Sequence, residues 1–276
     1  MKLEKNFYMK NGMPAHRLSY CAFLDVLGFS ARTRASYLDK THDALLREFH
    51  EIFGELIAEL KDQTTYSPLY YKSFSDNVLL AVPKYSHEME SEFGNILIAT
   101  SEYQFKMALK GFFVRGGLSV GPLFVDDNSV YGEALIAAYE LESKVAVNPI
   151  VVLSDDVAEI VNAHLKFYAP GVAPHRRLLL INSDGRYFIN YLDECILDTY
   201  DGWELDVESL AQHRDRIQHS LAKYVEQPAV FSKFSWLASY HNYFCDTVSA
   251  APEYLDELKV RSELMVVKFR RLEEGR

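Results

Sequence analysis

The hydrophobic pattern of the N-terminal half of the chain alternates between strand-like and helix-like segments. Apolar or aromatic runs of strand length lie at residues 18–27, 70–74, 77–82, 112–125 and 150–153. The polar turn Ser75-Asp76-Asn77 joins two of these runs and predicts a hairpin, because Asn and Asp tolerate the backbone of tight turns. Apolar residues recur at helical spacing over residues 41–60, 88–110 and 130–147. This order predicts an α+β fold of the ferredoxin-like type with a mainly antiparallel sheet.

Glycines and polar residues mark where the predicted elements are interrupted. Gly116 and Gly117 predict a break in the run at residues 112–125, or the close approach of another segment to its backbone. Gly121-Pro122 predicts a turn in the same run. Residues 1–16 are polar and rich in turn residues, so we expect a loose arm there.

The pattern weakens after residue 157. Strands are predicted at residues 177–181 and 187–192, and Pro228 separates helices predicted at residues 207–226 and 229–246. The second of these helices carries a stripe of aromatic side chains. Such a stripe favours packing in the core or against a second copy of the chain over a ligand site.

Composition narrows the class of protein. The 276 residues are 49% hydrophobic and 25% charged, as in ordinary globular proteins, and the net charge is −10. That charge argues against nucleic-acid binding through a basic surface, and an anionic ligand would need local cations or a metal ion. The three cysteines are far apart, which argues against a disulfide framework or a closely spaced zinc site. No signal peptide or membrane-spanning run is evident, so we expect a cytoplasmic protein with no membrane partner.

Three charged side chains stand out within the predicted strands. Asp25 ends a buried run, where an unpaired carboxylate costs several kcal/mol, so a partner or a ligand is expected. Asp76 lies in the hairpin turn near Lys72, and Arg115 lies inside a glycine-rich strand. Each has a structural alternative. Asp25 could pair with a basic side chain, and Arg115 could form an ion pair with a helix acid. Asp76 could lie in an ordinary solvated turn. The loop at Gly28 offers free backbone amides that suit phosphate oxygens, or it merely turns the chain.

Three motifs occur in a fixed order: FLDVLGF with Asp25, KSFSDNVLLAV with Asp76, and VRGGLSVGPLF followed by VYGEALIAAYELES. Together they resemble the catalytic domain of class III nucleotidyl cyclases, and most of all the bacterial pyrimidine cyclases of the Pycsar anti-phage system. The resemblance covers residues 18–157. It implies that residues 1–157 form a cyclase catalytic domain, which includes a short N-terminal arm, and that residues 158–276 form a C-terminal extension.

The resemblance implies roles for specific residues. Asp25, Asp76 and the backbone of Val26 match the ligands of two Mg²⁺ or Mn²⁺ ions. Arg115 matches an arginine that grips the terminal phosphates. The loop that would hold the triphosphate comprises Val26, Leu27, Gly28, Phe29 and Ser30. Lys72 and Ser129 match the positions that read the base, where Ser129 stands in place of an aspartate.

The resemblance also implies an activity and a partner. Lys72 can donate to a uracil carbonyl, which favours UTP over CTP and predicts 3′,5′-cyclic UMP as product. A head-to-tail homodimer would complete each site, and a separate effector would respond to the product. The transition-state asparagine and arginine of the family align with Ile136 and Glu140, which cannot replace them. Alternatives are therefore a cytidylate cyclase and a nucleotide sensor without turnover. A diguanylate-type synthase is disfavoured, because the hairpin lacks its glycine-glycine-acid signature.

Overall fold

The computed structural model describes residues 7–63, 68–169, 172–200, 202–261 and 267–272. Its centre is a nine-stranded sheet in the order β13-β9-β10-β8-β6-β3-β5-β4, with β7 beside β6. The strands are β3 Arg17–Val26, β4 Tyr70–Phe74, β5 Asn77–Pro83, β6 Val114–Val125, β7 Val130–Gly132, β8 Val151–Leu153, β9 Leu179–Ile181, β10 Tyr187–Ile189 and β13 Arg270–Arg271. Within this sheet the pairing of β6 with β8 is parallel and every other pairing is antiparallel.

The first part of this sheet has the predicted ferredoxin-like arrangement. Chain order is β3, α2 (His42–Gln63), β4, β5, α3 (Glu90–Leu109) and β6, and spatial order is β6-β3-β5-β4. Because β5 is antiparallel to both of its neighbours, β3 and β4 run parallel with β5 between them, which is a split βαβ unit. The predicted α+β class and mainly antiparallel sheet are confirmed.

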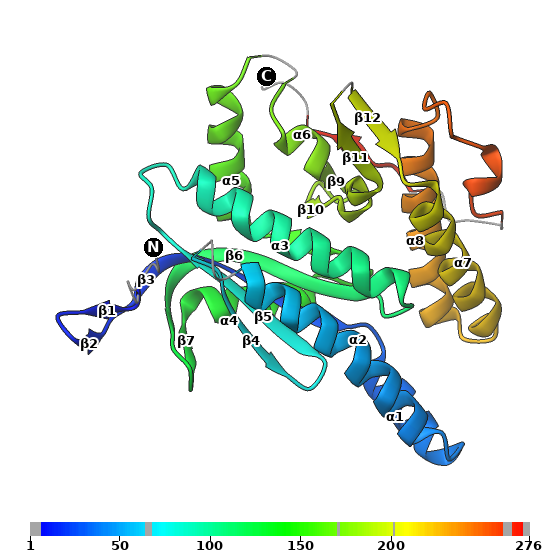
Figure 1. Ribbon diagram of the computed structural model, residues 1–276, viewed down its shortest axis with the longest axis horizontal. Helices are drawn as coiled ribbons and strands as arrows, with labels where there is room; N and C mark the ends of the chain where they lie inside the picture. The colour runs from blue at the N-terminus through cyan, green and yellow to red at the C-terminus, as the bar shows by residue number, and fades with distance from the viewer. Residues whose placement is uncertain (1–6, 64–67, 170–171, 201, 262–266, 273–276) are drawn as a thin grey trace.

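Helices cover both faces of the sheet (Figure 1). Alternate residues of β3 separate the two layers, since Tyr20, Ala22 and Leu24 pack with α2 and α3 in one core cluster. On the other face, Cys21 packs with Ala134 and other residues of α4 (Glu133–Lys144) in a second cluster. Asp25 continues the series of Cys21, so its side chain belongs to the face that α4 covers.

Two predictions about the N-terminal half are wrong. Strand β6 neither breaks at Gly116-Gly117 nor turns at Gly121-Pro122. The close-approach alternative for the glycine pair is confirmed, because a Cβ atom at Gly117 would lie 2.4 Å from the Ala138 carbonyl oxygen of α4. Residues 7–16 are not a loose arm: they form the hairpin β1 (Met9–Lys10) and β2 (Met13–Pro14), and Tyr8 is fully buried. Residues 1–6 lie outside the described residues.

One helix of the N-terminal half was also not predicted. Helix α1 (Phe29–Leu38) follows the loop at Gly28 directly. Its apolar side chains are not arranged at helical spacing, so no periodic signal marks it in the sequence.

The C-terminal half continues the same sheet. Strands β9, β10 and β13 extend it beyond β8, so the sheet contains residues from both sides of position 157. The predicted strand pair and both predicted helices occur. The remaining elements are α5 Asp155–His164, η1 Leu165–Phe167, α6 His175–Leu178, η2 Tyr191–Cys195, β11 Ile196–Thr199, β12 Gly202–Leu205, α7 Val207–Lys223, α8 Pro228–Thr247 and η3 Asp256–Leu258. The aromatic stripe of α8 lies in a third hydrophobic cluster, together with Phe113 and Phe188, so the prediction of core packing is confirmed.

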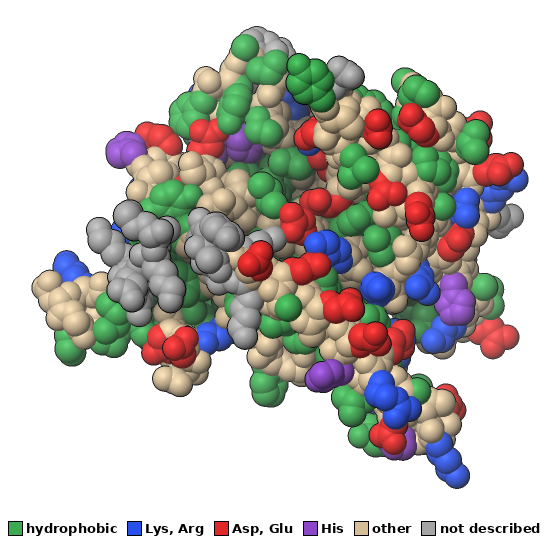
Figure 2. All heavy atoms as spheres, in the orientation of Figure 1, with side chains coloured by type: hydrophobic (Ala, Val, Ile, Leu, Met, Phe, Trp, Pro, Cys, Tyr) green, Lys and Arg blue, Asp and Glu red, His purple; other side chains and the backbone are tan. Residues whose placement is uncertain are grey.

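The described surface has no dominant basic region on the face shown in Figure 2, where acidic and basic side chains are interspersed. Among the described residues, no helix has both the length and the apolar character needed to cross a bilayer.

Candidate active site

Strand register brings three of the predicted residues to one end of the central sheet. Asp25 lies directly opposite Arg115 in the β3–β6 ladder. The ladder between β3 and β5 ends at Leu24 and Val78, and the turn that carries Asp76 follows immediately. Asp76 and Arg115, which follow Asp25 by 51 and 90 positions in the sequence, therefore lie beside it, as the predicted site requires.

The two aspartates and Arg115 form a compact charged group. The Arg115 Nε–H donates to Asp25 Oδ2 at 3.2 Å. Burial, and then the neighbouring carboxylate of Asp76, raise the pKa of Asp25, and Arg115 opposes this shift. The Ser75 hydroxyl donates to Asp76 Oδ1 at 3.0 Å, and Asp76 is only 8% exposed. A partly buried carboxylate, Asp25, and a buried one, Asp76, thus lie close together, and the Arg115 guanidinium contacts Asp25.

That helix supplies an acid that was not predicted as a site residue. Glu142 of α4 lies 2.6 Å from an Arg115 terminal nitrogen and is 4% exposed. Burial raises the pKa of Glu142, with Asp25 and Asp76 adding to the shift and Arg115 opposing it. The pair with Glu142 is the helix-acid alternative considered for Arg115, and it exists alongside the contact with Asp25. The signal was present in the sequence as the final acid of the AYELE run.

A lysine of α8, Lys233, lies within electrostatic range of Arg115. Burial, and then the positive charge of Arg115, lower the pKa of Lys233. The next residue, Phe234, packs edge-on against Phe113, with ring centroids 5.5 Å apart. Phe113 lies two positions before Arg115 in the chain. Lys233 forms no ion pair with any residue that the structure describes. Sequence reasoning missed it, because it lies in an aromatic helix more than 100 residues from the motifs.

The predicted phosphate loop runs from the end of β3 into α1. Gly28 adopts a left-handed conformation with φ 74°, which glycine tolerates without strain, and α1 begins at Phe29. Ser30 lies in the first turn, where amide groups lack intrahelical partners and no acidic side chain is present. The Leu27 amide is not free, because it donates to the Phe113 carbonyl at 2.8 Å. Val26 and Phe29 border the same loop.

A cavity of about 230 Å³ borders this loop. Its lining includes basic side chains from α1, from α7 and from the end of α3, namely Arg32, Arg216, Lys223 and Lys110. Arg32 is held by Glu48 at 2.8 Å, so not all of this charge is available to a ligand. On a chain of net charge −10 the cluster provides the local cations that an anionic ligand would need.

The predicted base-reading residues lie together, but with a further acid. The Ser129 hydroxyl donates to Asp126 Oδ1 at 3.1 Å, and the Asn128 and Ser129 amides donate to the same oxygen. These backbone amides chiefly lower the pKa of Asp126, and the positive charge of Lys72 contributes. An aspartate therefore accompanies Lys72 although none occupies position 129.

Ile136 and Glu140 lie on α4, as the alignment with the family implies. Ile136 is 61% exposed, and Glu140 forms an ion pair with Lys144 at 2.7 Å. Neither side chain belongs to the charged group at Asp25.

The donor set fits divalent cations. Asp25 and Asp76 present carboxylate oxygens, and the Val26 carbonyl lies beyond the end of the β3–β5 ladder; hard cations prefer such ligands. The mutual repulsion that helps to raise the pKa of Asp25 would be relieved by a bound cation. Within the described part of the chain, no group of three or more His, Cys, Asp or Glu side chains is arranged as a metal site, so two acids and backbone oxygen are the donors available.

The chain is similar to several solved structures at low sequence identity. No family model and no curated protein matches the sequence. Among solved structures, the monomeric guanylyl cyclase domain of the RhoGC fusion protein from Blastocladiella emersonii is similar, with 14% identity, a TM-score of 0.45, and coverage of 63% of this chain and 95% of that chain. The guanylate cyclase domain of RhGC from Catenaria anguillulae in complex with GTP has 14% identity and a TM-score of 0.43, with coverage of 63% and 96%.

A class III adenylyl cyclase-like ATP-binding protein from Pseudomonas aeruginosa is also similar, with 14% identity and a TM-score of 0.42. That likeness covers 57% of this chain and 37% of the other. At such identity and TM-score these likenesses assign no activity to the chain, so the case for function depends on its own residues.

Proposed function

We propose that this protein is a nucleotidyl cyclase that converts UTP to 3′,5′-cyclic UMP and pyrophosphate. In this reaction the ribose 3′-oxygen bonds to the α-phosphorus, the bond to the β-phosphate bridge breaks, and the 3′-hydroxyl proton is released. One observation carries the proposal: Asp25 and Asp76 arrive from different strands at one point, with Arg115 beside them. Packing alone gives no reason to bring two acids together where one is buried and the other is partly buried.

The residues of the site divide into metal-holding and phosphate-holding groups. Asp25, Asp76 and the Val26 carbonyl would hold two Mg²⁺ or Mn²⁺ ions, which when bound supply positive charge at the reacting phosphate and favour ionisation of the 3′-hydroxyl. The loop through Ser30, with the nearby basic cavity, would hold the triphosphate. Arg115 would turn part of its planar donor fork from Asp25 and Glu142 to the terminal phosphates.

Lys233 offers a cation where Ile136 and Glu140 supply none. Its ammonium group lies near Arg115 and has no described ion-pair partner. A positive charge held in a partly buried site stabilises the charge that develops on the phosphate and the leaving group. We therefore assign Lys233 a supporting role in turnover.

Base selection would involve Lys72, Asp126 and Ser129. Lys72 can donate to uracil O4 while Asp126 accepts from uracil N3–H, which supports UTP as substrate. The same pair can serve cytosine through its ring nitrogen and its amine, so CTP is the second candidate. Product analysis separates these two.

A head-to-tail homodimer would place Lys72 of one copy opposite the aspartates of the other. Large apolar side chains are exposed on β4, β7 and α4: Phe74 is 84% exposed, and Tyr131, Ile136 and Tyr139 are 68%, 61% and 53% exposed. Exposed apolar groups of this size suit burial by a second copy of the chain. The cyclic product would act in bacterial anti-phage defence through a separate effector.

A nucleotide sensor without turnover is the other candidate. It is favoured by Ile136 and Glu140, which contribute nothing to the charged group, and by the two acids that already engage Arg115. Lys233 and the paired aspartates favour the enzyme.

The deciding experiment is product analysis with purified protein. ATP, GTP, CTP and UTP are each incubated with Mn²⁺, and products are identified by chromatography and mass spectrometry. We expect cyclic UMP, its loss in Asp25→Ala and in Asp76→Ala, and full activity in Glu55→Ala on the exposed side of α2. Nucleotide binding without any product would establish the sensor instead, and persistent activity in either aspartate variant would refute the metal assignment.

A further inference from the structure

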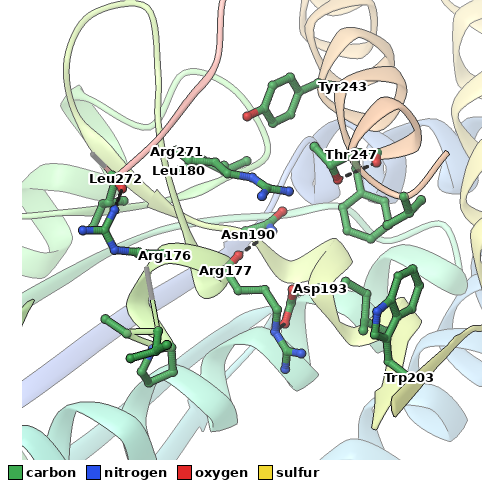
Figure 3. Close-up of a pocket in the computed structure, with 16 residues that line it drawn as sticks. Arg176, Arg177, Leu180, Asn190, Asp193, Trp203, Tyr243, Thr247, Arg271 and Leu272 are labelled. Atoms are coloured by element: carbon green, nitrogen blue, oxygen red, sulfur yellow. Dashed lines mark hydrogen bonds and ion pairs between the residues drawn. The ribbon is translucent and has the colours of Figure 1, made fainter. Parts of the chain in front are cut away.

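A second cavity lies among residues of the C-terminal half of the chain (Figure 3). Its volume is about 670 Å³, and α6, η2, α8 and β13 contribute to its lining. Cavities of this size hold small organic ligands. None of its lining residues belongs to the candidate active site, so it would be a separate binding site.

The charge of this cavity differs from that of the whole chain. Among the described residues, Arg176, Arg177 and Arg271 contribute guanidinium groups to its lining, and Asp193 is the one acid. Arg177 is held by Asp193 at 2.9 Å and by Asp198 at 3.3 Å. Arg176 and Arg271 form no ion pair with any described residue. A chain of net charge −10 thus has an excess of positive charge here, which suits an anion.

Two buried polar atoms of the lining lack hydrogen-bond partners among the described residues. Arg176 donates through one terminal nitrogen to the Leu272 carbonyl at 2.6 Å, but its Nε–H is buried and unpaired. Asp193 is 4% exposed, and its Oδ1 is unpaired while Oδ2 contacts Arg177. The unpaired Arg176 Nε–H is a donor, and the unpaired Asp193 Oδ1 can accept. A ligand with both an acceptor oxygen and a hydroxyl or amine would therefore satisfy both atoms.

Aromatic side chains provide flat surfaces beside these charges. Trp203 of β12 lines the cavity and is 45% exposed, which is a large exposure for an indole ring. Tyr243 of α8 also lines it, and in Figure 3 the Arg271 side chain reaches into the space between Tyr243 and Asn190. Exposed aromatic rings next to guanidinium groups suit a ligand that combines a planar ring with an anionic group.

We infer that this cavity binds a nucleoside monophosphate, with Arg271 and Arg176 on the phosphate, Trp203 on the base, and the orphan oxygen of Asp193 on a ligand hydroxyl or amine. The planar forks of the arginines match phosphate oxygens, and the ring of the base accounts for the exposed indole. The inference concerns a site other than the proposed cyclase centre and stands whether or not the chain has turnover.

The test uses the full chain and tryptophan fluorescence, because Trp203 lies in the cavity and the second tryptophan, Trp236, is buried in the core. AMP, GMP, CMP, UMP and inorganic phosphate are titrated separately in buffer with EDTA, which removes divalent ions from the candidate active site. We expect at least one nucleotide to quench the emission at submillimolar concentration. Quenching should disappear in Trp203→Phe, where calorimetry should still detect binding.

Charge variants then locate the ligand. Arg271→Gln should raise the dissociation constant roughly tenfold or more, because it removes a charge-assisted contact. Arg34→Gln, on the exposed side of α1, and Arg115→Gln, in the candidate active site, should leave it unchanged. Binding lost in Arg115→Gln but kept in Arg271→Gln would overturn the inference. So would the absence of binding by any nucleotide, or equal affinity for inorganic phosphate, which would leave no role for the base.

Discussion

Replacing Gly117 by alanine tests how α4 is held against the sheet and how Glu142 reaches Arg115. A Cβ atom at position 117 would lie 2.4 Å from the Ala138 carbonyl oxygen and 2.4 Å from Leu141 Cβ. Favourable contacts between such atoms occur at about 3.5–4.0 Å, so α4 would have to move away by about 1 Å. Two of the clashing atoms belong to or directly adjoin the helix backbone, so a side-chain rotation cannot relieve the contact.

The expected loss is at the upper end for an added methyl group in a packed core, about 3 kcal/mol. Urea unfolding followed by circular dichroism measures it. With a slope of about 3 kcal/mol per molar urea, the midpoint should fall by about 1 M. Glu142 lies one turn beyond Ala138 on the same helix, so the shift should also weaken its contact with Arg115 and lower any nucleotide turnover.

The matched control is Gly94→Ala in α3. A Cβ atom there would meet nothing within 4 Å, and alanine in a helix interior is favoured over glycine by about 0.5–1 kcal/mol. The two identical substitutions should therefore change the free energy of unfolding in opposite directions. If Gly117→Ala were as stable as Gly94→Ala, the close packing of α4 on β6 would be refuted.

Three further outcomes are expected. Lys233→Met should lower turnover at least tenfold with little change in melting temperature. Lys166→Met, on the exposed surface, should change neither turnover nor melting temperature. Equal activity in the two variants would exclude Lys233 from the site. Glu142→Gln should destabilise the fold by about 1–3 kcal/mol in urea unfolding, since it removes a nearly buried partner of Arg115 while Asp25 remains.

The third prediction concerns stability in acid. Burial lowers the pKa of His241 to about 4 and that of His213 well below 6.5. Between these values and pH 6.5 the two histidines are therefore protonated in the unfolded chain but not in the folded one. The contribution of His241 to the free energy of unfolding should be complete above pH 6.5 and smaller by about 2 kcal/mol at pH 5, and His241→Gln should remove this loss in urea unfolding compared at the two pH values.

The sequence predicts much of the ferredoxin-like unit, because its strands and helices have strong periodic patterns. The turn at Asp76 and the buried run ending at Asp25 could be identified without any structure, and so could the arginine opposite them. The break expected at Gly116 and Gly117 was wrong for a physical reason. A strand can remain straight at glycines when they serve the approach of a helix, and the sequence alone does not distinguish that use from a bulge.

Contacts between distant segments could not be predicted in the same way. Asp126 was passed over, because the position matched by alignment was 129, and only the folded hairpin turns the Asp126 carboxylate to the Ser129 amide. Lys233 has no neighbouring motif, and its place near Arg115 follows from the packing of Phe234 on Phe113. Tyr8 is similar: its burial against Tyr70 depends on a hairpin whose only sequence signal is the pair Asn11-Gly12.

The C-terminal half is part of both the fold and the candidate site. Strands β9, β10 and β13 continue the sheet past β8, and Phe113, which precedes β6, has its core partners in α7 and α8. Arg115 lies two residues beyond Phe113, so the helix that buries this ring also determines where Lys233 stands relative to the aspartates. In the proposed site, Ile136 and Glu140 of α4 supply no positive charge, so Lys233 can supply a cation only if α8 is fixed on the sheet. The aromatic core of the C-terminal half, which includes Phe234 and Trp236 of α8, holds that helix in place.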